Sequence, residues 1–381
     1  MLHLPLSATG PDGPYGYYRE LREKAPAFWS QRQQAWVVAG FDDALDLLTR
    51  PALFSSHIQS GLDASLAGAD PPRHTRVRNI LAAAFSADAV AAFEDWLAAT
   101  ARDLLAKAMA AGSFDVIADF ARPLPRLMLA RMLGIPECRM VDFARWSEAA
   151  MSLFAPGSGP DAATNGKALH QMLVVCRDEL FPAYASGAID CPFSPVLRSG
   201  TQAALELEER LSLFRLLVLA GQETSAAAIG NAAALLFRFP GELAKVRGDP
   251  NLVPVLVEES LRYESPVQVV RRGSIGGAVI SGVELPADAE VVVILGAANR
   301  DPRQFPDPDR FNVTRQPRQH LAFGSGPHYC VGARLARLES SAALAALIPV
   351  MSNLRPRFDP DAIRMANRGA FRGVERLDVV C

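Results

Sequence analysis

The stretch HLAFGSGPHYCVGARLARLE, residues 320–339, places Cys330 after two glycines and directly before a predicted helix. A cysteine at a helix start faces unpaired backbone N–H groups and the positive end of the helix dipole, and both favour the thiolate. Gly324 and Gly326 allow close backbone approach and conformations that other residues avoid. The stretch therefore predicts a nucleophile, with a nearby histidine as its base, or a metal ligand. A buried structural cysteine beside a Gly-Pro turn is the alternative.

Composition restricts the kind of protein that contains this stretch. The chain has 381 residues, 50% of them hydrophobic and 21% charged, with a formal net charge of −2. Such a chain can bury a large core, and its charge gives no global reason to expect nucleic acid or an anionic membrane as a partner. The longest apolar stretch, 211–237, is interrupted by four residues that make a bilayer span unlikely to form: Arg215, Gln222, Glu223 and Asn231. We therefore expect neither nucleic acid nor a membrane among its partners.

Two features of the sequence, its first residues and its cysteine pattern, predict a cytoplasmic protein. The first residues, MLHLPLSATGPDGPYG, contain neither a basic leader nor a long apolar run, so they predict no secretory signal. The five cysteines are Cys138, Cys176, Cys191, Cys330 and Cys381. Their odd number, wide spacing and lack of a C-x-x-C pair argue against a disulfide scaffold and a structural zinc.

Hydrophobic periodicity predicts a mainly helical body over about 71–264, with β-containing parts over about 25–60 and 265–381. The longest helix is expected at about 206–237. The Pro-rich stretch 300–319 cannot form regular structure. Neither a repeat nor a flexible linker divides the chain. We therefore expect one domain over all 381 residues, mainly α with small β-sheets (α+β).

A carboxylate and a hydroxyl, Glu223 and Thr224, interrupt the long apolar helix just after Ala220 and Gly221. Burying an unpaired carboxylate is costly, so such a group is either partnered or functional. A glycine and a threonine hydroxyl within one turn can also loosen the helical hydrogen-bond ladder. A partly exposed helix face is an equal alternative.

Two further pairs lie at helical spacing. Glu259 and Arg262 are at i, i+3, close enough to pair, although an exposed pair contributes only about 0.5 kcal/mol or less. His74 and Arg78, in ADPPRHTRVRNILAAAFS, are at i, i+4. Two such donors on one helix face suit an anionic ligand, although solvated charge is the more common explanation.

Together these four stretches resemble the cytochrome P-450 family in order and spacing, over residues 17–380. The cysteine loop carries the most specific part of the resemblance: Phe323, Gly324, Gly326, His328, Cys330 and Gly332. In the family this cysteine is the thiolate ligand of haem iron. The stretch 220–224 is similar to the family's oxygen-activation segment, although Gln222 stands where His is common and Ser225 where a second Thr is common.

The resemblance implies a set of residues around haem b (iron protoporphyrin IX), with Cys330 as the metal ligand. The implied propionate ligands are His74, Arg78, Arg272 and His328, with Arg271 replacing Arg272 if the strand register slips by one. Other implied haem contacts are Ala220, Phe323 and Gly324.

Three more roles follow from the resemblance. Glu223 and Thr224 would be the catalytic pair that delivers protons to iron-bound dioxygen. A structural triad would hold the chain around the haem loop: Glu259, Arg262 and Arg310. The substrate pocket would be formed by residues 54–69 and by Gly221, Val267, Val269, Ala370 and Phe371, with Gly369 beside them. Most of these are small or apolar, which indicates an apolar substrate.

The implied fold holds haem between the long central helix and the helix after Cys330. The implied function is a haem-thiolate monooxygenase that activates O2 and hydroxylates or epoxidises a small, largely apolar organic molecule, in natural-product biosynthesis or catabolism. No flavin or nicotinamide motif is present. Electrons would therefore come from a separate ferredoxin and ferredoxin reductase, with NAD(P)H acting only through them. We expect a monomer.

Several alternatives remain open at this stage. The same fold can catalyse oxidative coupling or ring closure, also on a carrier-bound substrate, and a non-catalytic haem sensor is a third reading. The segment 155–205 departs from the family pattern and predicts an unusual lid. Four arginines are candidates for a basic docking face, or else are ordinary surface residues: Arg73, Arg76, Arg334 and Arg337.

Overall fold

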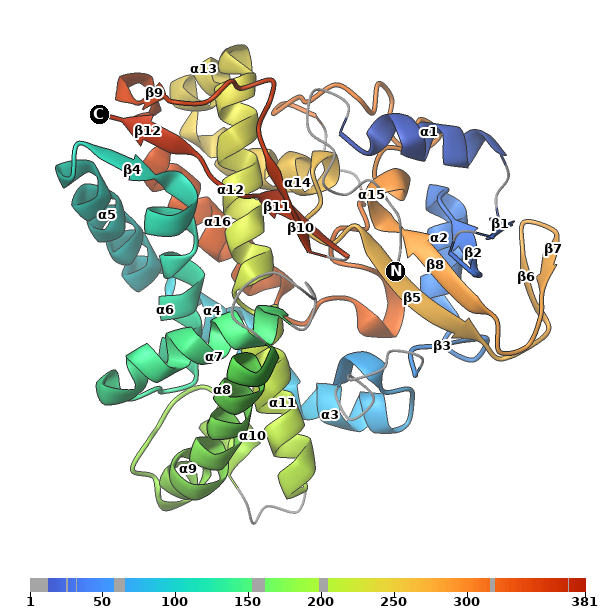
Figure 1. The fold of residues 1–381 in the computed structure, drawn as a ribbon, viewed down its shortest axis with the longest axis horizontal. Helices are drawn as coiled ribbons and strands as arrows, with labels where there is room; N and C mark the ends of the chain where they lie inside the picture. The colour runs from blue at the N-terminus through green and yellow to red at the C-terminus, as the bar shows by residue number, and fades with distance from the viewer. Residues whose placement is uncertain are drawn as a thin grey trace.

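A computed structural model describes residues 13–24, 27–31, 33–57, 66–152, 162–198, 205–315, 319–368 and 370–381. Figure 1 shows a large helical part on one side and a smaller part, built around a β-sheet, on the other. The predicted mainly helical fold with small sheets is therefore confirmed. None of the described helices is long and apolar enough to cross a membrane.

The helical part packs its apolar faces into a common core in which Phe120, Phe143, Trp146 and Phe214 are fully buried. Its longer helices are α3 (Arg73–Ala82), α5 (Glu94–Ala110), α6 (Pro123–Met132), α7 (Met140–Ser152), α8 (Ala162–Val175), α11 (Leu207–Ala220), α12 (Glu223–Arg238), α13 (Pro240–Gly248), α14 (Val253–Tyr263) and α16 (Ala333–Leu347). It also contains the short helices α4 (Ala87–Ala91), α9 (Phe181–Ser186) and α10 (Ser194–Leu197) and two π-helical segments, Val116–Ala121 and Cys176–Leu180.

The larger sheet has five strands in the order β1-β2-β8-β5-β3. They are β1 (Ala27–Ser30), β2 (Ala35–Val38), β3 (Phe54–Ser55), β5 (Val269–Ser274) and β8 (Glu290–Ile294). Only β2 and β8 pair in parallel. The helices α1 (Tyr15–Lys24), α2 (Phe41–Thr49) and α15 (Leu295–Ala298) pack beside this sheet.

Three small sheets complete the described strands. β6 (Ala278–Ile280) pairs with β7 (Val283–Leu285), and β4 (Ser113–Asp115) and β9 (Arg355–Pro356) flank β12 (Asp378–Val380). The hairpin of β10 (Met365–Arg368) and β11 (Phe371–Val374) lies across α12 (Figure 1). The described part of the Pro-rich stretch, 300–315, has only turns and irregular backbone, as predicted.

The helix expected at about 206–237 is interrupted, which corrects the prediction of one continuous helix. α11 ends at Ala220 and α12 begins at Glu223. A Cβ on Gly221 would lie 2.9 Å from the carbonyl oxygen of Leu217, so glycine suits this position. The Thr224 hydroxyl donates to the carbonyl oxygen of Ala220 at 2.8 Å. This side-chain hydrogen bond satisfies a backbone carbonyl at the break between the two helices.

Candidate active site

The loop before α16 presents Cys330 to the interior of the site. The Cys330 N–H donates to the carbonyl oxygen of Phe323 at 2.9 Å, which closes the loop. Gly324 and Gly326 have φ values of 69° and 66°, in the region that glycine adopts without strain. A Cβ on Gly326 would also clash with the carbonyl oxygen of Leu48 in α2. These two glycines therefore allow the tight turn of this loop, and Gly326 lets the loop pack closely against α2.

Cys330 is suited to a metal better than to nucleophilic catalysis. Its side chain is exposed on one side but crowded by protein on the others, and this loss of hydration raises the pKa of its thiol. The N–H of Gly332 and the charges of Arg78 and Arg337 act in the opposite direction. Among the described residues no base contacts the sulfur. A bound cation is what would make the thiolate the stable form.

The loop histidines are engaged elsewhere. Nε2 of His328 lies 3.0 Å from the hydroxyl oxygen of Ser56, and Nε2 of His320 lies 3.1 Å from a carboxylate oxygen of Glu258. Burial and the neighbouring charge of Arg272 lower the pKa of His328 to about 3. Neither histidine is therefore placed to activate Cys330, and the nucleophile alternative loses its base.

Four basic side chains gather near the cysteine: His74 and Arg78 from α3, Arg272 from β5 and His328 from the loop. The rings of His74 and His328 have centroids 4.1 Å apart. Burial lowers the pKa of His74, with the charge of Arg78 adding to the effect. Burial also lowers the pKa of Arg272 to about 10. Asp70 is the one carboxylate that acts on these groups in the described chain.

This cluster fits a bound dianion such as the two propionates of haem. Both ring nitrogens of buried His74 lack a hydrogen-bond partner within the described residues, and Arg272 is only 6% exposed. Leaving such donors unsatisfied is costly unless a ligand accepts from them. Arg271, the alternative to Arg272, pairs with Glu290 instead, because the register places Arg271 opposite Val292 and therefore diagonal to Glu290 on the same face of the sheet.

The acid of the acid-alcohol pair has a cationic partner that the sequence did not reveal. A guanidinium nitrogen of Arg122 lies 3.9 Å from a carboxylate oxygen of Glu223. Both side chains line a narrow space between α12, the π-helical segment Val116–Ala121 and the β10–β11 hairpin, together with Phe371 and Arg372. No local motif marks Arg122, because the two residues are about one hundred positions apart and meet only through tertiary packing.

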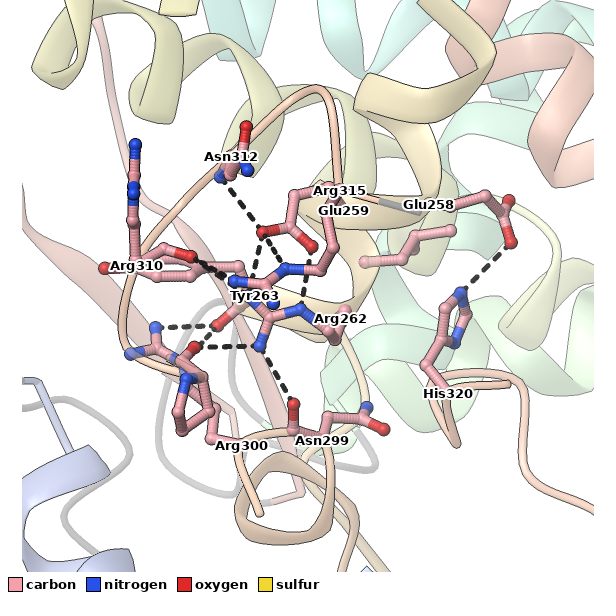
Figure 2. A network of polar contacts seen from close by, with 12 residues as sticks. Glu258, Glu259, Arg262, Tyr263, Asn299, Arg300, Arg310, Asn312, Arg315 and His320 are labelled. Atoms are coloured by element: carbon pink, nitrogen blue, oxygen red, sulfur yellow. Dashed lines mark hydrogen bonds and ion pairs between the residues drawn. The ribbon is translucent and has the colours of Figure 1, made fainter. Parts of the chain in front are cut away.

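The predicted ion pair of Glu259 and Arg262 is present and buried, with N–O distances of 2.7 and 2.8 Å. The third member of the triad was predicted as Arg310, and this is wrong. Nε of Arg315 lies 3.1 Å from Oε1 of Glu259, whereas the exposed Arg310 side chain points away (Figure 2). The N–H of Asn312 also donates to Oε1 of Glu259, which draws the chain around 312–315 toward this carboxylate.

The predicted pocket residues fall into two groups. Val267 forms a β-bridge with Phe371, and the N–H of Gln268 donates to the carbonyl oxygen of Ala370 at 2.9 Å. These contacts bring the start of β5 beside the β10–β11 hairpin. Val269, by contrast, is 3% exposed and packs in the core beside α1.

Other predicted positions have mixed outcomes. Ala220 keeps exposed surface at the break between α11 and α12, and Gly221 is half-buried there. Residues 58–65, 155–161, 199–204 and Gly369 lie outside the described residues, so the expectations for the pocket loop and the lid stay predictions. Three of the four docking arginines have carboxylate partners within the chain: Arg73 and Arg76 with Glu209, and Arg337 with Glu258.

Comparisons with known proteins identify the family of the chain. The family model described as Cytochrome P450 matches residues 198–352. The chain is 33% identical over 390 residues to 6-deoxyerythronolide B hydroxylase of Saccharopolyspora erythraea, which covers 96% of this chain and 95% of the hydroxylase. The ligand-free structure of cytochrome P450 TbtJ1 has a TM-score of 0.89 at 32% identity, over 98% of each chain.

A second solved structure is P450BioI in complex with hexadec-9Z-enoic acid ligated acyl carrier protein. It has a TM-score of 0.87 at 29% identity and covers 97% of this chain and 99% of its own. Likeness of this extent covers almost the whole chain. Membership implies haem as cofactor and O2 as co-substrate. The chain belongs to the cytochrome P450 family and is an oxidoreductase of the monooxygenase class.

Proposed function

We propose that the chain is a single-domain haem-thiolate monooxygenase that hydroxylates or epoxidises a small, largely apolar organic molecule. The observation that carries this proposal is the basic cluster, whose one carboxylate neighbour among the described residues is Asp70, beside a cysteine that no described base contacts. A nucleophilic or purely structural cysteine would leave the unpartnered ring nitrogens of His74 and the buried charge of Arg272 unexplained. A haem bound between the basic cluster and Cys330 would explain both features.

In this proposal separate residues bind the iron and the propionates of haem. Cys330 would bind the iron, and His74, Arg78, Arg272 and His328 would hold the propionates. When bound, haem supplies the activation of O2 and the transfer of one oxygen atom to the substrate, and its electron-rich thiolate ligand favours O–O cleavage. The protein contributes ligation, orientation of the substrate and controlled delivery of protons.

Glu223 and Thr224 would carry those protons. Glu223 is 21% exposed beside Arg122, so it can exchange protons with solvent through the space that both residues line. The Thr224 hydroxyl donates to the carbonyl oxygen of Ala220, at the break that exposes Ala220. A hydroxyl there can pass a proton onward by rotating, a positioned acid–base role.

The ferrous carbonyl spectrum tests the assignment of Cys330. We expect the purified protein to contain haem and to show the red-shifted band of thiolate ligation, and Cys330→Ala to abolish that band. Cys138→Ala, which removes an exposed cysteine far from the loop in sequence, serves as the control and should keep it. A protein without haem, or a band that survives Cys330→Ala, would overturn the proposal.

Thr224→Ala tests the proton relay. Without the hydroxyl the proton path through this residue would be lost, so peroxide release should rise and product per electron should fall about tenfold or more. Thr224→Ser keeps a hydroxyl and should recover most of the coupling. Product and peroxide are measured together with a reconstituted redox chain. Unchanged coupling in Thr224→Ala would remove this residue from the relay.

Electron donors and location are part of the same proposal. A separate ferredoxin and its reductase, with NAD(P)H as the ultimate donor, would reduce the enzyme, because the chain has no flavin or nicotinamide motif of its own. All five cysteines are free, which supports a reducing compartment, the cytoplasm. We propose a monomer. Reduction rates with purified ferredoxins of different charge would identify the partner class.

A substrate bound to a carrier protein is the second candidate, which also includes oxidative coupling or ring closure. The observation behind it is the likeness to P450BioI, whose structure contains an acyl carrier protein. Spin-state titrations with the same acyl chain, free and carrier-bound, separate the two candidates. Tighter binding of the carrier-bound form would favour this alternative, and equal binding would favour a free substrate.

A further inference from the structure

A polar network of Glu258, His320 and Arg337 lies against the cysteine loop. Nε of Arg337, on α16, donates to Oε1 of Glu258 at 2.7 Å, and Nη2 donates to Oε2 at 2.9 Å. Glu258 lies on α14, and the ring of His320 reaches the same carboxylate (Figure 2). Although burial opposes ionisation, the hydrogen bonds from His320 and Arg337 lower the pKa of Glu258 to about 2. The carboxylate therefore stays charged throughout the working pH range.

The hydrogen bonds of His320 determine its tautomer. The N–H of Ala322 donates to Nδ1 of His320 at 3.2 Å, so Nδ1 carries a lone pair. Nε2 then carries the hydrogen and donates it to Glu258. The side chain is only 5% exposed, and both of its nitrogens are engaged. His320 therefore holds Glu258 at a fixed place beside the loop.

Arg337 in turn contacts the loop at two places before the cysteine. Its Cζ atom lies 4.5 Å from the centroid of the Phe323 ring, within the range of a cation–π contact. Its Nη1 donates to the hydroxyl oxygen of Tyr329 at 3.2 Å. Phe323 accepts the N–H of Cys330, and Tyr329 is the residue before it. One guanidinium thus links the two chain segments that place the sulfur.

We propose that Arg337, held by Glu258 and His320, is a positioning residue that sets the place of Cys330 and the reduction potential of the iron bound to it. This inference rests on the proposed haem-thiolate function. The loop contacts argue for the effect on position. The charge argues for the effect on potential, because the positive charge of Arg337 favours the thiolate and Glu258 balances that charge.

Removing the charge of Arg337 and removing the charge of Glu258 should shift the reduction potential in opposite directions. Reduction of the iron adds negative charge, which a nearby cation stabilises and a nearby anion opposes. Arg337→Gln should therefore lower the equilibrium constant for one-electron reduction, and Glu258→Gln should raise it, each by about threefold to tenfold. A network that only stabilised the fold would give no such opposition.

Arg337→Lys separates position from charge. Lysine keeps the cation but not the planar fork that binds two carboxylate oxygens and covers Phe323. We expect a potential close to that of the unchanged protein, with a larger fraction of the carbonyl complex lacking the red-shifted thiolate band. The control is Arg139→Gln, which removes an arginine that contacts both carboxylate oxygens of Glu179 at 2.6 Å on another surface.

Spectroelectrochemical titration of the holoproteins and their ferrous carbonyl spectra provide the test. Potentials of Arg337→Gln and Glu258→Gln that shift the same way, or no further than Arg139→Gln, would overturn the inference. If Arg337→Gln binds no haem, Glu258→Gln and Arg337→Lys decide the matter, and unchanged potential and unchanged band in these two overturn it. Absence of the thiolate band in the unchanged protein would overturn the proposed function instead.

Discussion

At the scale of single residues, the site contains buried basic groups, His74 and Arg272, that the described residues do not fully partner. Arg272 is the clearest case, because its carboxylate neighbour Asp70 already accepts from the Ser56 N–H at 2.8 Å and from the Ser55 hydroxyl. The hydrogen bond that Arg272 makes, to the carbonyl oxygen of Arg271, leaves most of its guanidinium available. A fold keeps such a costly group where a ligand neutralises it.

Arg272→Gln should accelerate haem release from the holoprotein. A charge-assisted hydrogen bond contributes about 1.5 to 3 kcal/mol, so the rate of haem transfer to an acceptor protein should rise about 10- to 100-fold. The matched control is Arg271→Gln, whose side chain pairs with Glu290 on the neighbouring strand. Equal release rates for both variants would contradict the assignment of Arg272 to the propionates.

Sequence patterns predicted those residues whose spacing is local. The pair Glu259–Arg262 lies within one helix turn, so its spacing alone predicted the contact. Cys330 and its glycines lie within one loop, and their spacing carried the resemblance from which the role of the cysteine was inferred. Arg315 and Arg122 were missed because their partners come from other elements. The Pro-rich stretch has no regular periodicity, so the position of a residue in it does not indicate which way its side chain points. The choice between Arg310 and Arg315 therefore depended on the path of the backbone, which only the structure gives.

At the scale of elements, the stretch 300–315 is held by side chains in place of regular hydrogen bonding. Arg315 donates to the carbonyl oxygens of Pro306, Asp307 and Arg310 and also pairs with Glu259. A single guanidinium thus stabilises a segment that prolines prevent from forming a helix. A side chain also satisfies the backbone at the break at 221–222. There Gly221 fits close to the carbonyl oxygen of Leu217, and the Thr224 hydroxyl donates to the carbonyl oxygen of Ala220.

Arg315→Ala and Arg310→Ala should differ strongly in stability. Arg315→Ala leaves buried Glu259 with one cation fewer and frees three carbonyl groups, so the free energy of unfolding should fall by about 2 to 4 kcal/mol. Arg310→Ala removes an exposed side chain and should stay within about 0.5 kcal/mol. Denaturant unfolding of the two holoproteins gives the comparison. Similar losses would restore Arg310 to the triad.

At the contact of α12 with α16 lies the buried acid Glu339, whose side chain is not paired with a cation among the described residues and has the hydroxyl of Ser225 as its polar neighbour. Burial raises its pKa from 4.5 to about 8, and nearby Ser225 acts in the opposite direction. The folded chain therefore binds this proton more tightly than the unfolded chain does. Its contribution to stability is full below pH 4.5 and is lost as the pH rises through about 8.

Glu339→Gln should flatten this pH dependence. The amide cannot ionise, so the variant should be more stable than the unchanged protein above about pH 8, with a smaller difference at mildly acidic pH. Thermal unfolding across this range provides the measurement. Glu208→Gln, at an exposed glutamate of α11, is the control and should follow the unchanged protein. A parallel pH profile for Glu339→Gln would show that its carboxyl is hydrated or partnered.

At the scale of the whole molecule, the helical part and the sheet part meet at a polar cluster next to the predicted pocket. Nε of Arg372, on β11, lies 2.7 Å from Oε1 of Glu264, and the Tyr15 hydroxyl of α1 donates to the same oxygen at 2.8 Å. The isolated bridge between Val267 and Phe371 follows directly from this arrangement. Residues distant in sequence thus hold the two pocket segments together, which no local pattern could have predicted.

Asn231 of α12 completes that junction, and its removal should loosen the pocket without unfolding the protein. Its amide donates to the carbonyl oxygens of Glu264 and Arg372 and accepts the N–H of Val374. Asn231→Ala leaves these backbone groups buried and unpaired, so the free energy of unfolding should fall by about 2 to 3 kcal/mol.

Hydrogen exchange locates the effect of Asn231→Ala. Because the β10–β11 hairpin depends on this amide for its contact with α12, amide exchange should accelerate there first, while β1 and β2 keep their protection. Ligands that shift the spin state should bind more weakly and with less discrimination between them. Asn353→Ala, at an exposed asparagine, is the control. Uniform acceleration over the whole chain would mean that Asn231 supports global stability and does not specifically hold the pocket.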